Sequence, residues 1–349
     1  METITPDDNE PRHITSATLI DVARVAGVSP ITVSRALNQP QLVRPGTLAR
    51  IQAAVRETGY AKNPAPTGAP AVKGGRSKLV ALILPTVSNP IFTDMVQAAS
   101  DKLTDGGYQL MLGLAGYELW REEILVETVL SRRPDGIILT GTLHSDNTRK
   151  HLAEAGIPVV ETWDLTPSPI DMLVGFSHEE VGKTVAQRML DRGYRRIALL
   201  TANDPRAARR NQGMQAALAR QGVSVVATET VAVPASLQLG REGCARLLSS
   251  APDMELVVCS SDTLAQGALT EAASRGIKVP DQLAILGFGD LNFAAHTYPS
   301  LSSVRVDGHA IGRLAADMLL QRLALPAGAT VAGPQVIDTG FELIERGST

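Results

Sequence analysis

Residues 18–38 read TLIDVARVAGVSPITVSRALN, and their pattern predicts two short helices joined by a tight turn. Thr18 can cap the first helix, and Gly27 supplies the left-handed residue that ends it. Ser29 can cap the second helix, and Pro30 fits its first position, where no backbone N–H is needed. Small apolar residues recur at helical spacing and predict one shared buried face, made of Val22, Ala23, Ala26, Val33, Ala36 and Leu37. This layout is typical of a helix-turn-helix.

The outward face of the second helix carries side chains that suit the major groove of DNA. Ser34 and Arg35 can hold phosphates. Arg35 or Asn38 can read base edges, and Ile31 can contact a thymine methyl group. Two helices joined by a glycine turn also occur in proteins that bind no DNA. Here the caps, the glycine, the small inward residues and the basic outward face agree, and this agreement favours DNA binding.

The charge of the chain is distributed unevenly. The 349 residues carry a formal net charge of −3. Residues 12–78 contain ten Lys and Arg against two acids, whereas residues 79–349 contain 23 bases against 30 acids. A short segment can be basic by chance, but this one coincides with the predicted helix-turn-helix. The coincidence favours a polyanion as the partner of the N-terminal segment.

The run DVARVAGVSPITVSRALN closely resembles the DNA-binding headpiece of the lactose-repressor (LacI) family of bacterial transcription regulators. The resemblance continues through a third helix over Pro45–Thr58, through Gly59-Tyr60 and Asn63-Pro64, and covers nearly all of the chain after residue 17. It implies a homodimer on a pseudo-palindromic double-stranded operator. Together with the outward face, it predicts DNA contacts by Leu19, Ser29, Pro30, Ile31, Thr32, Ser34, Arg35, Asn38, Val43, Arg44, Thr47, Tyr60, Asn63, Ala69 and Val72.

A segment rich in Pro, Gly and Ala follows and predicts a linker over residues 63–78. In the resembled family this region forms a hinge helix on DNA, and a leucine from it wedges into the minor groove. Ala69 and Val72 stand where the family has Ala and Leu. The prolines and glycines of the linker oppose a helix, so the sequence leaves its formation open. The expected organisation is a disordered tail over 1–16, a DNA-binding domain over 17–62, the linker, and a core over 79–349.

Beyond residue 78, apolar strand-like runs alternate with helical patterns, which predicts parallel sheets with helices on both faces. The strand-like runs are Leu79–Leu84, Gln109–Leu114, Gly136–Leu139, Pro158–Val160, Met172–Val174, Ile197–Leu200, Val223–Val226, Leu256–Cys259, Leu283–Gly287 and Val336–Ile337. The helical patterns include Phe92–Asp105, Glu122–Arg132, Glu179–Arg192, Asn211–Gln221, Gln238–Ser249 and Thr263–Arg275. The predicted fold class is α/β, with an all-α helix-turn-helix headpiece and a two-lobed core that resembles periplasmic binding proteins. The resemblance implies three chain crossings between the lobes, the last of them near Pro334.

Cysteine usage and the N-terminus bear on the compartment of the protein. Cys244 and Cys259 lack metal-ligand spacing, and two isolated cysteines in so long a chain fit a reducing cytosol. The N-terminus lacks the apolar segment of a signal peptide, and no stretch approaches the length of a membrane span. We therefore expect a cytoplasmic protein without membrane contacts, which is nucleoid-associated when bound to its operator. No motif indicates a cofactor or a metal.

The resemblance places a small effector in the cleft between the lobes. It implies binding by Ser88, Phe92, Tyr117, Thr140, His144, Glu161, Trp163, Arg210, Ser261 and Asp290. Arg210, three residues before Gly213, matches the basic ligand-binding position of the family, and an arginine can grip a carboxylate with two parallel bonds. Gly289 stands where many members that bind neutral sugars carry Asp. Loss of that carboxylate beside a retained arginine favours an anionic polyol.

Three segments resemble the gluconate-utilisation repressors in particular: Ala115–Tyr117, Leu139–Ser145 and Asp171–Ser177. They make gluconate the expected effector. A ketogluconate, a phosphorylated sugar acid and a neutral sugar are the alternatives, because a single hydroxyl changes the choice of ligand by only a few kcal/mol.

Simpler interpretations exist for several of these side chains. Arg210 begins a predicted helix, where arginines are usually solvated. Trp163 could belong to the core, and His144 could be an ordinary loop residue. Asp262 could cap a helix, and Asp290 could be a turn residue.

The sequence therefore favours a DNA-binding repressor of sugar-acid catabolism genes that a small effector releases from its operator. The opposite response, to a corepressor, stays open. Asp94, Met95 and Ala98 are expected to form part of the dimer face. A solute-binding protein is the alternative outside transcription, but the basic headpiece and the missing export signal count against it. An enzyme is disfavoured because the sequence shows no nucleophile–base pair, metal-ligand cluster or phosphate loop.

Overall fold

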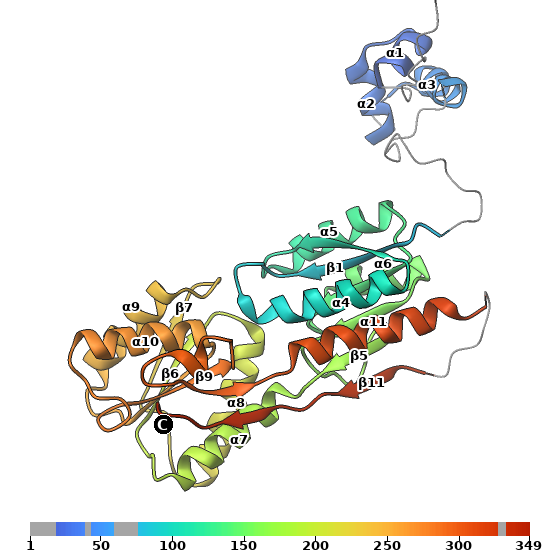
Figure 1. The fold of residues 1–349 in the computed structure, drawn as a ribbon. Coiled ribbons are helices and arrows are strands. Elements are labelled where there is room, and N and C mark those ends of the chain that lie inside the picture. Colours follow the sequence, from blue (N-terminus) through green and yellow to red (C-terminus); the bar gives the residue numbers. More distant parts are fainter. Residues whose placement is uncertain (1–18, 39–42, 59–75, 327–332) are drawn as a thin grey trace, which may run out of the picture. The chain divides into compact units, whose positions relative to one another are not determined.

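The computed structural model describes residues 19–38, 43–58, 76–326 and 333–349. They belong to two compact units, Met1–Gly75 and Arg76–Thr349 (Figure 1). The expected tail over 1–16, the Thr18 cap and most of the expected linker over 63–78 lie outside the described residues. None of the described helices is both long and apolar enough to cross a membrane.

The first unit packs three helices around a small apolar core. The helices are α1 (Leu19–Ala26), α2 (Pro30–Asn38) and α3 (Pro45–Thr58). The buried core consists of Val22, Ala23, Ala26, Val33, Ala36, Ile51 and Ala54. Gly27 has a φ of 64°, the left-handed conformation that ends α1. Ser29 Oγ accepts a hydrogen bond from the backbone N–H of Thr32 at 3.3 Å, at the start of α2. The predicted helix-turn-helix is confirmed.

The second unit begins with a lobe built on a parallel six-stranded sheet, of order β11-β5-β4-β3-β1-β2. Its strands are β1 (Leu79–Leu84), β2 (Gln109–Leu114), β3 (Gly136–Thr140), β4 (Val159–Thr162), β5 (Met172–Gly175) and β11 (Gln335–Asp338). Its helices are η2 (Pro90–Phe92), α4 (Thr93–Asp105), α5 (Leu119–Ser131), α6 (Asp146–Ala155) and α11 (Gly308–Ala324). Alternate residues of β1 pack into different apolar clusters, so helices cover both faces of the sheet.

The other lobe repeats this plan on a sheet of order β12-β10-β9-β8-β6-β7. Its strands are β6 (Ile197–Ala202), β7 (Ala227–Val231), β8 (Leu256–Cys259), β9 (Ala284–Gly289), β10 (Ser302–Arg305) and β12 (Glu342–Ile344). Its helices are α7 (His178–Asp191), α8 (Pro205–Arg220), α9 (Leu237–Ser250), α10 (Asp262–Ser274) and η3 (Ala294–His296). Only the β10–β12 pair is antiparallel among the described strands. The predicted two-lobed α/β core is confirmed.

The chain crosses between the lobes three times. The crossings lie between β5 and α7, between β10 and α11, and between β11 and β12. The last one therefore falls at residues 339–341, and the expected crossing near Pro334 is wrong. The reason is that β11, which follows Pro334, still pairs with β5 in the first sheet.

Helix α11 returns to the first lobe and packs along α4. Gly312 lies so close to α4 that a Cβ there would overlap the carbonyl oxygen of Met95. Met95 is fully buried and Ala98 is 5% exposed. The prediction that these two residues form part of a dimer face is therefore wrong, although Asp94 beside them is exposed.

Local patterns misplaced one strand, and several elements were assigned no range. The apolar run Val223–Val226 precedes β7, because Gly222 ends α8 in the left-handed conformation and Val223 then donates to the carbonyl oxygen of Leu218. The sequence analysis named no range for α6, α11, β10, β12 and the short helix η3. Helix α11 is buried on much of its circumference, which weakens its periodicity, and β10 begins with two buried serines, Ser302 and Ser303.

Candidate functional site

The exposed side of α2 carries residues that the sequence assigns to DNA contact. Ile31 is 73% exposed, and Arg35 is exposed one helical turn later. Of the other residues in that set, Ser29, Pro30 and Arg44 are exposed, and Thr32, Ser34, Val43 and Thr47 are half-buried. The side chains of Leu19 and Asn38, and the residues Tyr60, Asn63, Ala69 and Val72, lie outside the described part of the chain.

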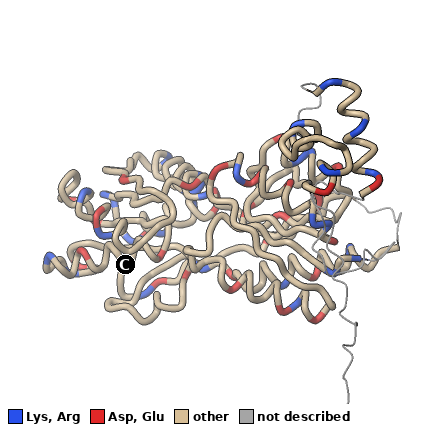
Figure 2. The backbone as a smooth tube through the Cα atoms, turned by 90° about the horizontal axis from the view of Figure 1, so that it is seen from above, with Lys and Arg blue, Asp and Glu red and all other residues tan. Residues whose placement is uncertain are grey.

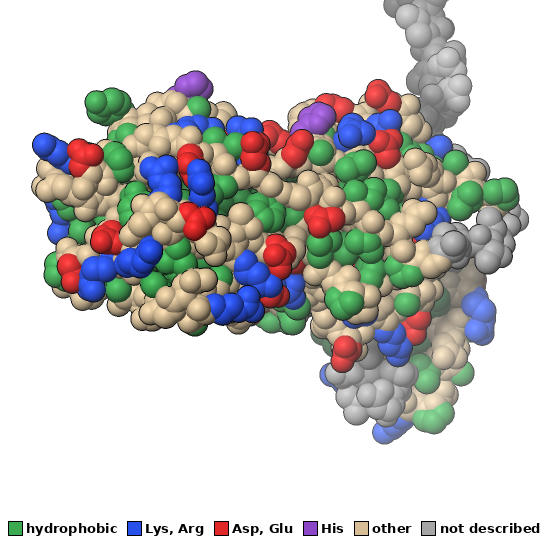
Figure 3. Space-filling view, turned by 90° about the horizontal axis from the view of Figure 1, so that it is seen from below, with side chains coloured by type: hydrophobic (Ala, Val, Ile, Leu, Met, Phe, Trp, Pro, Cys, Tyr) green, Lys and Arg blue, Asp and Glu red, His purple; other side chains and the backbone are tan. Residues whose placement is uncertain are grey.

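Arginine dominates the charge of this unit. Its described residues include five arginines against one aspartate and one glutamate (Figure 2). Arg24 pairs with Asp21 at 2.9 Å, whereas no ion pair joins Arg35 to a described carboxylate. In the second unit, charges of both signs are interspersed, as a space-filling view of one face shows (Figure 3). The first unit is therefore the part of the described chain that suits a polyanion.

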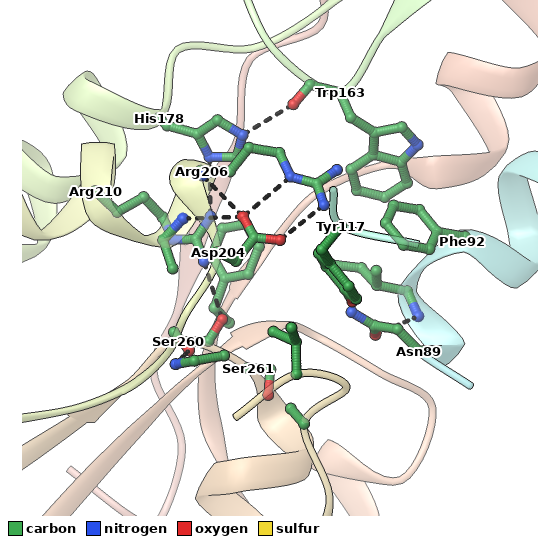
Figure 4. A pocket seen from close by; sticks show the side chains of 16 residues that line it. Asn89, Phe92, Tyr117, Trp163, His178, Asp204, Arg206, Arg210, Ser260 and Ser261 are labelled. Carbon is green, nitrogen blue, oxygen red and sulfur yellow. Dashed lines mark hydrogen bonds and ion pairs between the residues drawn. The ribbon is translucent and has the colours of Figure 1, made fainter. Parts of the chain in front are cut away.

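A cavity between the two lobes of the second unit encloses about 530 Å³ of empty space, part of it open solvent (Figure 4). Its side chains follow the carboxyl ends of strands, where ligands bind in open α/β sheets. The first lobe contributes Asn89, Ile91, Phe92, Tyr117 and Trp163, and the second contributes His178, Asp204, Arg206, Arg210, Ser260, Ser261 and Phe288. Of the expected effector-binding residues, the cavity brings together Phe92, Tyr117, Trp163, Arg210 and Ser261.

Asp204 neutralises Arg206 inside this cavity. Asp204 caps α8 by accepting hydrogen bonds from the backbone N–H groups of Arg206 at 2.8 Å and Ala207 at 3.4 Å. The Arg206 guanidinium donates to both carboxylate oxygens, from Nη2 at 2.8 Å and from Nε at 3.2 Å. Burial by itself raises the pKa of Asp204, but the charge and hydrogen bonds of Arg206 outweigh it and hold that pKa well below its usual range.

Arg210 lies one turn further along α8 and is held by neutral groups. Its Nη1 donates to Nδ1 of His178 at 2.9 Å, and its Nη2 donates to the carbonyl oxygen of Ser260 at 3.0 Å. The guanidinium lies 3.7 Å from the ring centroid of Phe288. Burial lowers the pKa of Arg210 to about 10, so the side chain remains a cation at neutral pH. No described carboxylate forms an ion pair with Arg210.

Two glycines fix the position of Arg210 by letting α7 approach α8 closely. A Cβ at Gly182 would overlap the carbonyl oxygen of Arg210, and a Cβ at Gly213 would overlap that of Glu179. This close packing brings His178, the first residue of α7, within hydrogen-bond reach of Arg210.

An ion pair beside the cavity joins the lobes directly. Arg209 of α8 donates to Asp164, which follows β4 in the first lobe. Asp164 also accepts hydrogen bonds from Thr142 Oγ1 at 3.2 Å and from the backbone N–H of Leu165 at 2.8 Å. Burial raises the pKa of Asp164, and Arg209 acts in the opposite direction. The charge of Arg209 is therefore compensated across the cleft.

Thr140 and His144 line a second cavity instead, whose walls come mostly from the first lobe and also include the start of α8 in the second lobe. The two cavities share Tyr117, Asp204 and Arg206. Glu161, fully buried, lines neither cavity.

His144 lies between two glutamates. Its Nδ1 is 2.6 Å from Oε1 of Glu122, and its Nε2 is 3.4 Å from Oε1 of Glu161. Burial lowers the pKa of His144, but the hydrogen bond to Glu122 and the negative charges of both glutamates outweigh it and raise the pKa to about 9. His144 is therefore an imidazolium ion at neutral pH, paired within its own lobe.

Two further expected effector contacts lie outside both cavities. Ser88 is exposed in the loop before η2. The carboxylate of Asp290 binds Arg305 at 2.8 Å and Arg346 at 2.6 Å, so it is occupied within the second lobe.

The residue that caps α10 is Ser261, and the expectation that Asp262 does so is wrong. Ser261 Oγ accepts a hydrogen bond from the backbone N–H of Leu264 at 3.3 Å. Asp262 is fully buried and accepts from Ser303 Oγ at 2.6 Å. Ser261 thus combines a cap with a place on the cavity wall.

The sequence analysis missed Asp204 and His178, whereas the resemblance had already placed Arg206 in the cleft, and Arg206 does line the cavity. A signal for Asp204 exists, because Asp204-Pro205 is a helix cap followed by a first-turn proline. Helix α8 therefore starts six residues before the expected Asn211, and the arginines at 206 and 210 share one face of it. Among the described residues, no group of three or more His, Cys, Asp or Glu side chains could hold a metal ion.

Comparison with known proteins gives matches along the whole chain. The model of bacterial regulatory proteins of the lacI family matches residues 18–63, and that of the periplasmic binding protein-like domain matches residues 186–349. The HTH-type transcriptional regulator GntR of Pseudomonas aeruginosa is 39% identical over 348 residues, which is 99% of each chain. The crystal structure of the transcription regulator GntR from Chromobacterium violaceum is 34% identical and has a TM-score of 0.72, covering 77% of this chain and 98% of that one. A LacI-family regulator structure from Silicibacter pomeroyi is 33% identical, with a TM-score of 0.74 over 95% and 99% of the chains.

The raised pKa of His144 predicts a pH-dependent contribution to stability. Because the folded-state pKa of about 9 lies above the unfolded value, the contribution is full below about pH 6.5 and is lost as pH rises to about 9. Denaturant unfolding of His144→Gln and wild type should differ by on the order of 3 kcal/mol at pH 6, and this difference should shrink towards pH 9. The exposed His309→Gln variant is the control, and a difference for His144→Gln that does not change with pH would contradict the paired imidazolium.

Proposed function

Because this chain belongs to the LacI family of bacterial regulatory proteins, and is a DNA-binding transcriptional regulator rather than an enzyme, we propose that it represses genes of sugar-acid catabolism. A monoanionic sugar acid, gluconate, binds in the cleft between the lobes and releases the protein from its operator. The proposal is supported by the charge of the cleft, the character of its walls, and the resemblance of Leu139–Ser145 to gluconate-utilisation repressors.

The net charge of the cleft is the main argument for a monoanionic ligand. Arg206 is neutralised by Asp204, and Arg209 by Asp164. Arg210 has only neutral acceptors, so a single uncompensated positive charge faces the cavity. A buried charge is costly unless it is paired. One carboxylate, bound by the unused N–H groups of Arg210, supplies that pair.

The remaining walls suit the polyol part of such a ligand. Phe92 and Trp163 meet edge to face with ring centroids 5.3 Å apart and offer apolar surface to C–H groups. Tyr117 and Ser261 carry hydroxyl groups on the cavity wall. A tyrosine phenol is protonated at neutral pH and can donate, and burial raises the pKa of Tyr117 further.

Release from the operator follows from the position of the ligand between two lobes. An effector that contacts both lobes binds most tightly to one of their relative orientations and shifts the equilibrium towards it. In a dimer, such a shift changes the spacing of the two headpieces and lowers their joint affinity for two half-sites.

The effector assignment predicts a clear order of affinities. Calorimetric titration should show micromolar gluconate binding and no glucose binding, because glucose lacks the carboxylate. Glucarate and 6-phosphogluconate should bind more weakly than gluconate, because the cleft offers one uncompensated charge. Arg210→Met should weaken gluconate binding by about 100-fold or more, as expected for loss of a buried charged partner.

Arg220→Met, an exposed change on the same helix, is the matched control and should bind gluconate like wild type. Equal binding of glucose and gluconate would contradict an anionic effector. Tighter binding of 6-phosphogluconate would transfer the assignment to a phosphorylated sugar acid.

The exposed face of α2 predicts which arginine matters for DNA. With an operator selected from a random-sequence pool, Arg35→Ala should reduce affinity at least tenfold and lower the salt slope by about one, because a phosphate contact releases a counterion. Arg24→Ala removes an arginine already paired with Asp21 and should have a smaller effect. Unequal loss across sequences, with an unchanged salt slope, would instead assign Arg35 to base readout.

An exposed apolar surface on the first lobe supports the homodimer. It consists of Leu112 and Leu114 on the edge strand β2 and of Leu119, Trp120 and Ile124 on α5, with exposed fractions of 46%, 53%, 49%, 58% and 56%. Large exposed apolar side chains on neighbouring elements are typical of protein interfaces, and Trp is enriched at their centres.

Changing Trp120 to Glu should therefore shift the protein towards monomers in sedimentation velocity at micromolar concentration, because a charge would be buried in the interface. Val336→Glu alters an apolar residue, 50% exposed, on the opposite edge strand, and should leave the dimer intact. A Trp120→Glu protein that stays dimeric would exclude this surface.

A further inference from the structure

His178 is a buried residue of the cleft to which neither the family resemblance nor the pairing of charges assigns a role. It is the first residue of α7, where the chain enters the second lobe, and it is 3% exposed. On one side it contacts Arg210 of its own lobe, and on the other the backbone of Trp163 in the first lobe (Figure 4). We propose that His178 is a positioning residue that fixes Arg210 for an anionic effector and links its occupancy to the first lobe. This inference rests on the proposed function.

The two hydrogen bonds of His178 require one tautomer. Arg210 has only N–H donors, so Nδ1 of His178, 2.9 Å away, must be the acceptor. The carbonyl oxygen of Trp163 only accepts, so Nε2, also 2.9 Å away, must carry the proton. The neutral Nε2–H imidazole satisfies both contacts, whereas an imidazolium ion would place N–H against N–H at Arg210. Burial and the charges of Arg210 and Arg206 lower the pKa of His178 well below its usual value, which is consistent with this neutral form.

Neutrality is what makes His178 suitable beside Arg210. A carboxylate at this position would hold the guanidinium equally well but would cancel its charge, and the cleft would then no longer require an anion. An apolar residue would leave the charge but would not orient it. The imidazole orients the guanidinium and leaves its charge for the ligand.

Several of the few aromatic residues of this chain lie around His178. The chain has five Phe and two Trp. The ring centroids of Phe176 and Phe288 lie 4.6 Å and 6.3 Å from the centroid of the imidazole. The ring centroid of Trp163 lies 6.2 Å from that of Phe176. These rings exclude water from both hydrogen bonds of His178 and so strengthen them.

Trp163 continues the connection into the first lobe. It is 2% exposed, and its φ of 68° places its backbone in the left-handed region, where a bulky residue persists only if its surroundings hold it. Its indole N–H donates to the sulfur of Met95, on the face of α4 that packs against α11. Hydrogen bonds therefore connect Arg210 on α8, through His178 and Trp163, to Met95 on α4, so that an effector that displaces Arg210 also affects α4.

Two conservative variants separate the two bonds of His178. Asparagine places an amide oxygen near the position of Nδ1, so His178→Asn keeps an acceptor for Arg210 and loses the bond to Trp163. Glutamine places an amide N–H near the position of Nε2, so His178→Gln keeps the bond to Trp163 and loses the one to Arg210. The exposed His309→Asn is the control.

The measurements are the dissociation constant of gluconate and the ratio of operator affinities without and with saturating gluconate. His178→Asn should bind gluconate with a dissociation constant within threefold of wild type, but its ratio of operator affinities should be at least tenfold smaller. His178→Gln should bind gluconate at least tenfold more weakly. The proposed role of His178 is overturned if both variants lower only the melting temperature. It is also overturned if both variants change the dissociation constant of gluconate and the ratio of operator affinities alike.

Nitrogen NMR of the imidazole in the effector-free protein tests His178 independently of the effector. The Nε2–H tautomer at pH 7 supports the inference, and an imidazolium ion or the Nδ1–H tautomer overturns it. A wild-type protein that has this tautomer but binds no gluconate would overturn the proposed effector alone.

Discussion

One buried cation, Arg210, has to be held in place without being neutralised, and the rest of the cleft is arranged accordingly. Its neighbours on α8, Arg206 and Arg209, are each paired with a carboxylate, and the pairs would leave a neutral site if Arg210 were paired as well. Instead, an imidazole, a carbonyl oxygen and an aromatic face hold it. All three fix a guanidinium without neutralising it, so the site is organised in advance for a ligand that brings the missing negative charge.

The same interactions that hold Arg210 also connect the lobes. His178 reaches the backbone of Trp163, and Arg209 reaches Asp164, so two neighbouring residues of the first lobe are tied to the arginine face of α8. Three short crossings, at separate places in the sequence, also join the lobes. A ligand bound at this point therefore acts on contacts that help to set the relative orientation of the lobes.

Sequence patterns predicted the headpiece and most of the core because these elements are determined locally. The Ser29 cap, a left-handed glycine and small residues at helical spacing specify α1 and α2 within about twenty residues, and strands buried on both faces form continuous apolar runs. The patterns failed where tertiary contacts replace local ones. Helix α11 is apolar on several sides because it packs on both α4 and the sheet, and Val223 is apolar because it closes the end of α8.

The sequence by itself determined the helix-turn-helix, the alternation of strands and helices, and the presence of an arginine at position 210. Only the tertiary structure decided which of the cleft's charges remain uncompensated. Arg209 and Asp164 are 45 positions apart, and Arg210 and His178 are 32 apart, so no local pattern relates them. Electrostatic compensation depends on distances of a few ångströms between side chains, and these distances exist only once the chain has crossed between the lobes and α7 has packed against α8.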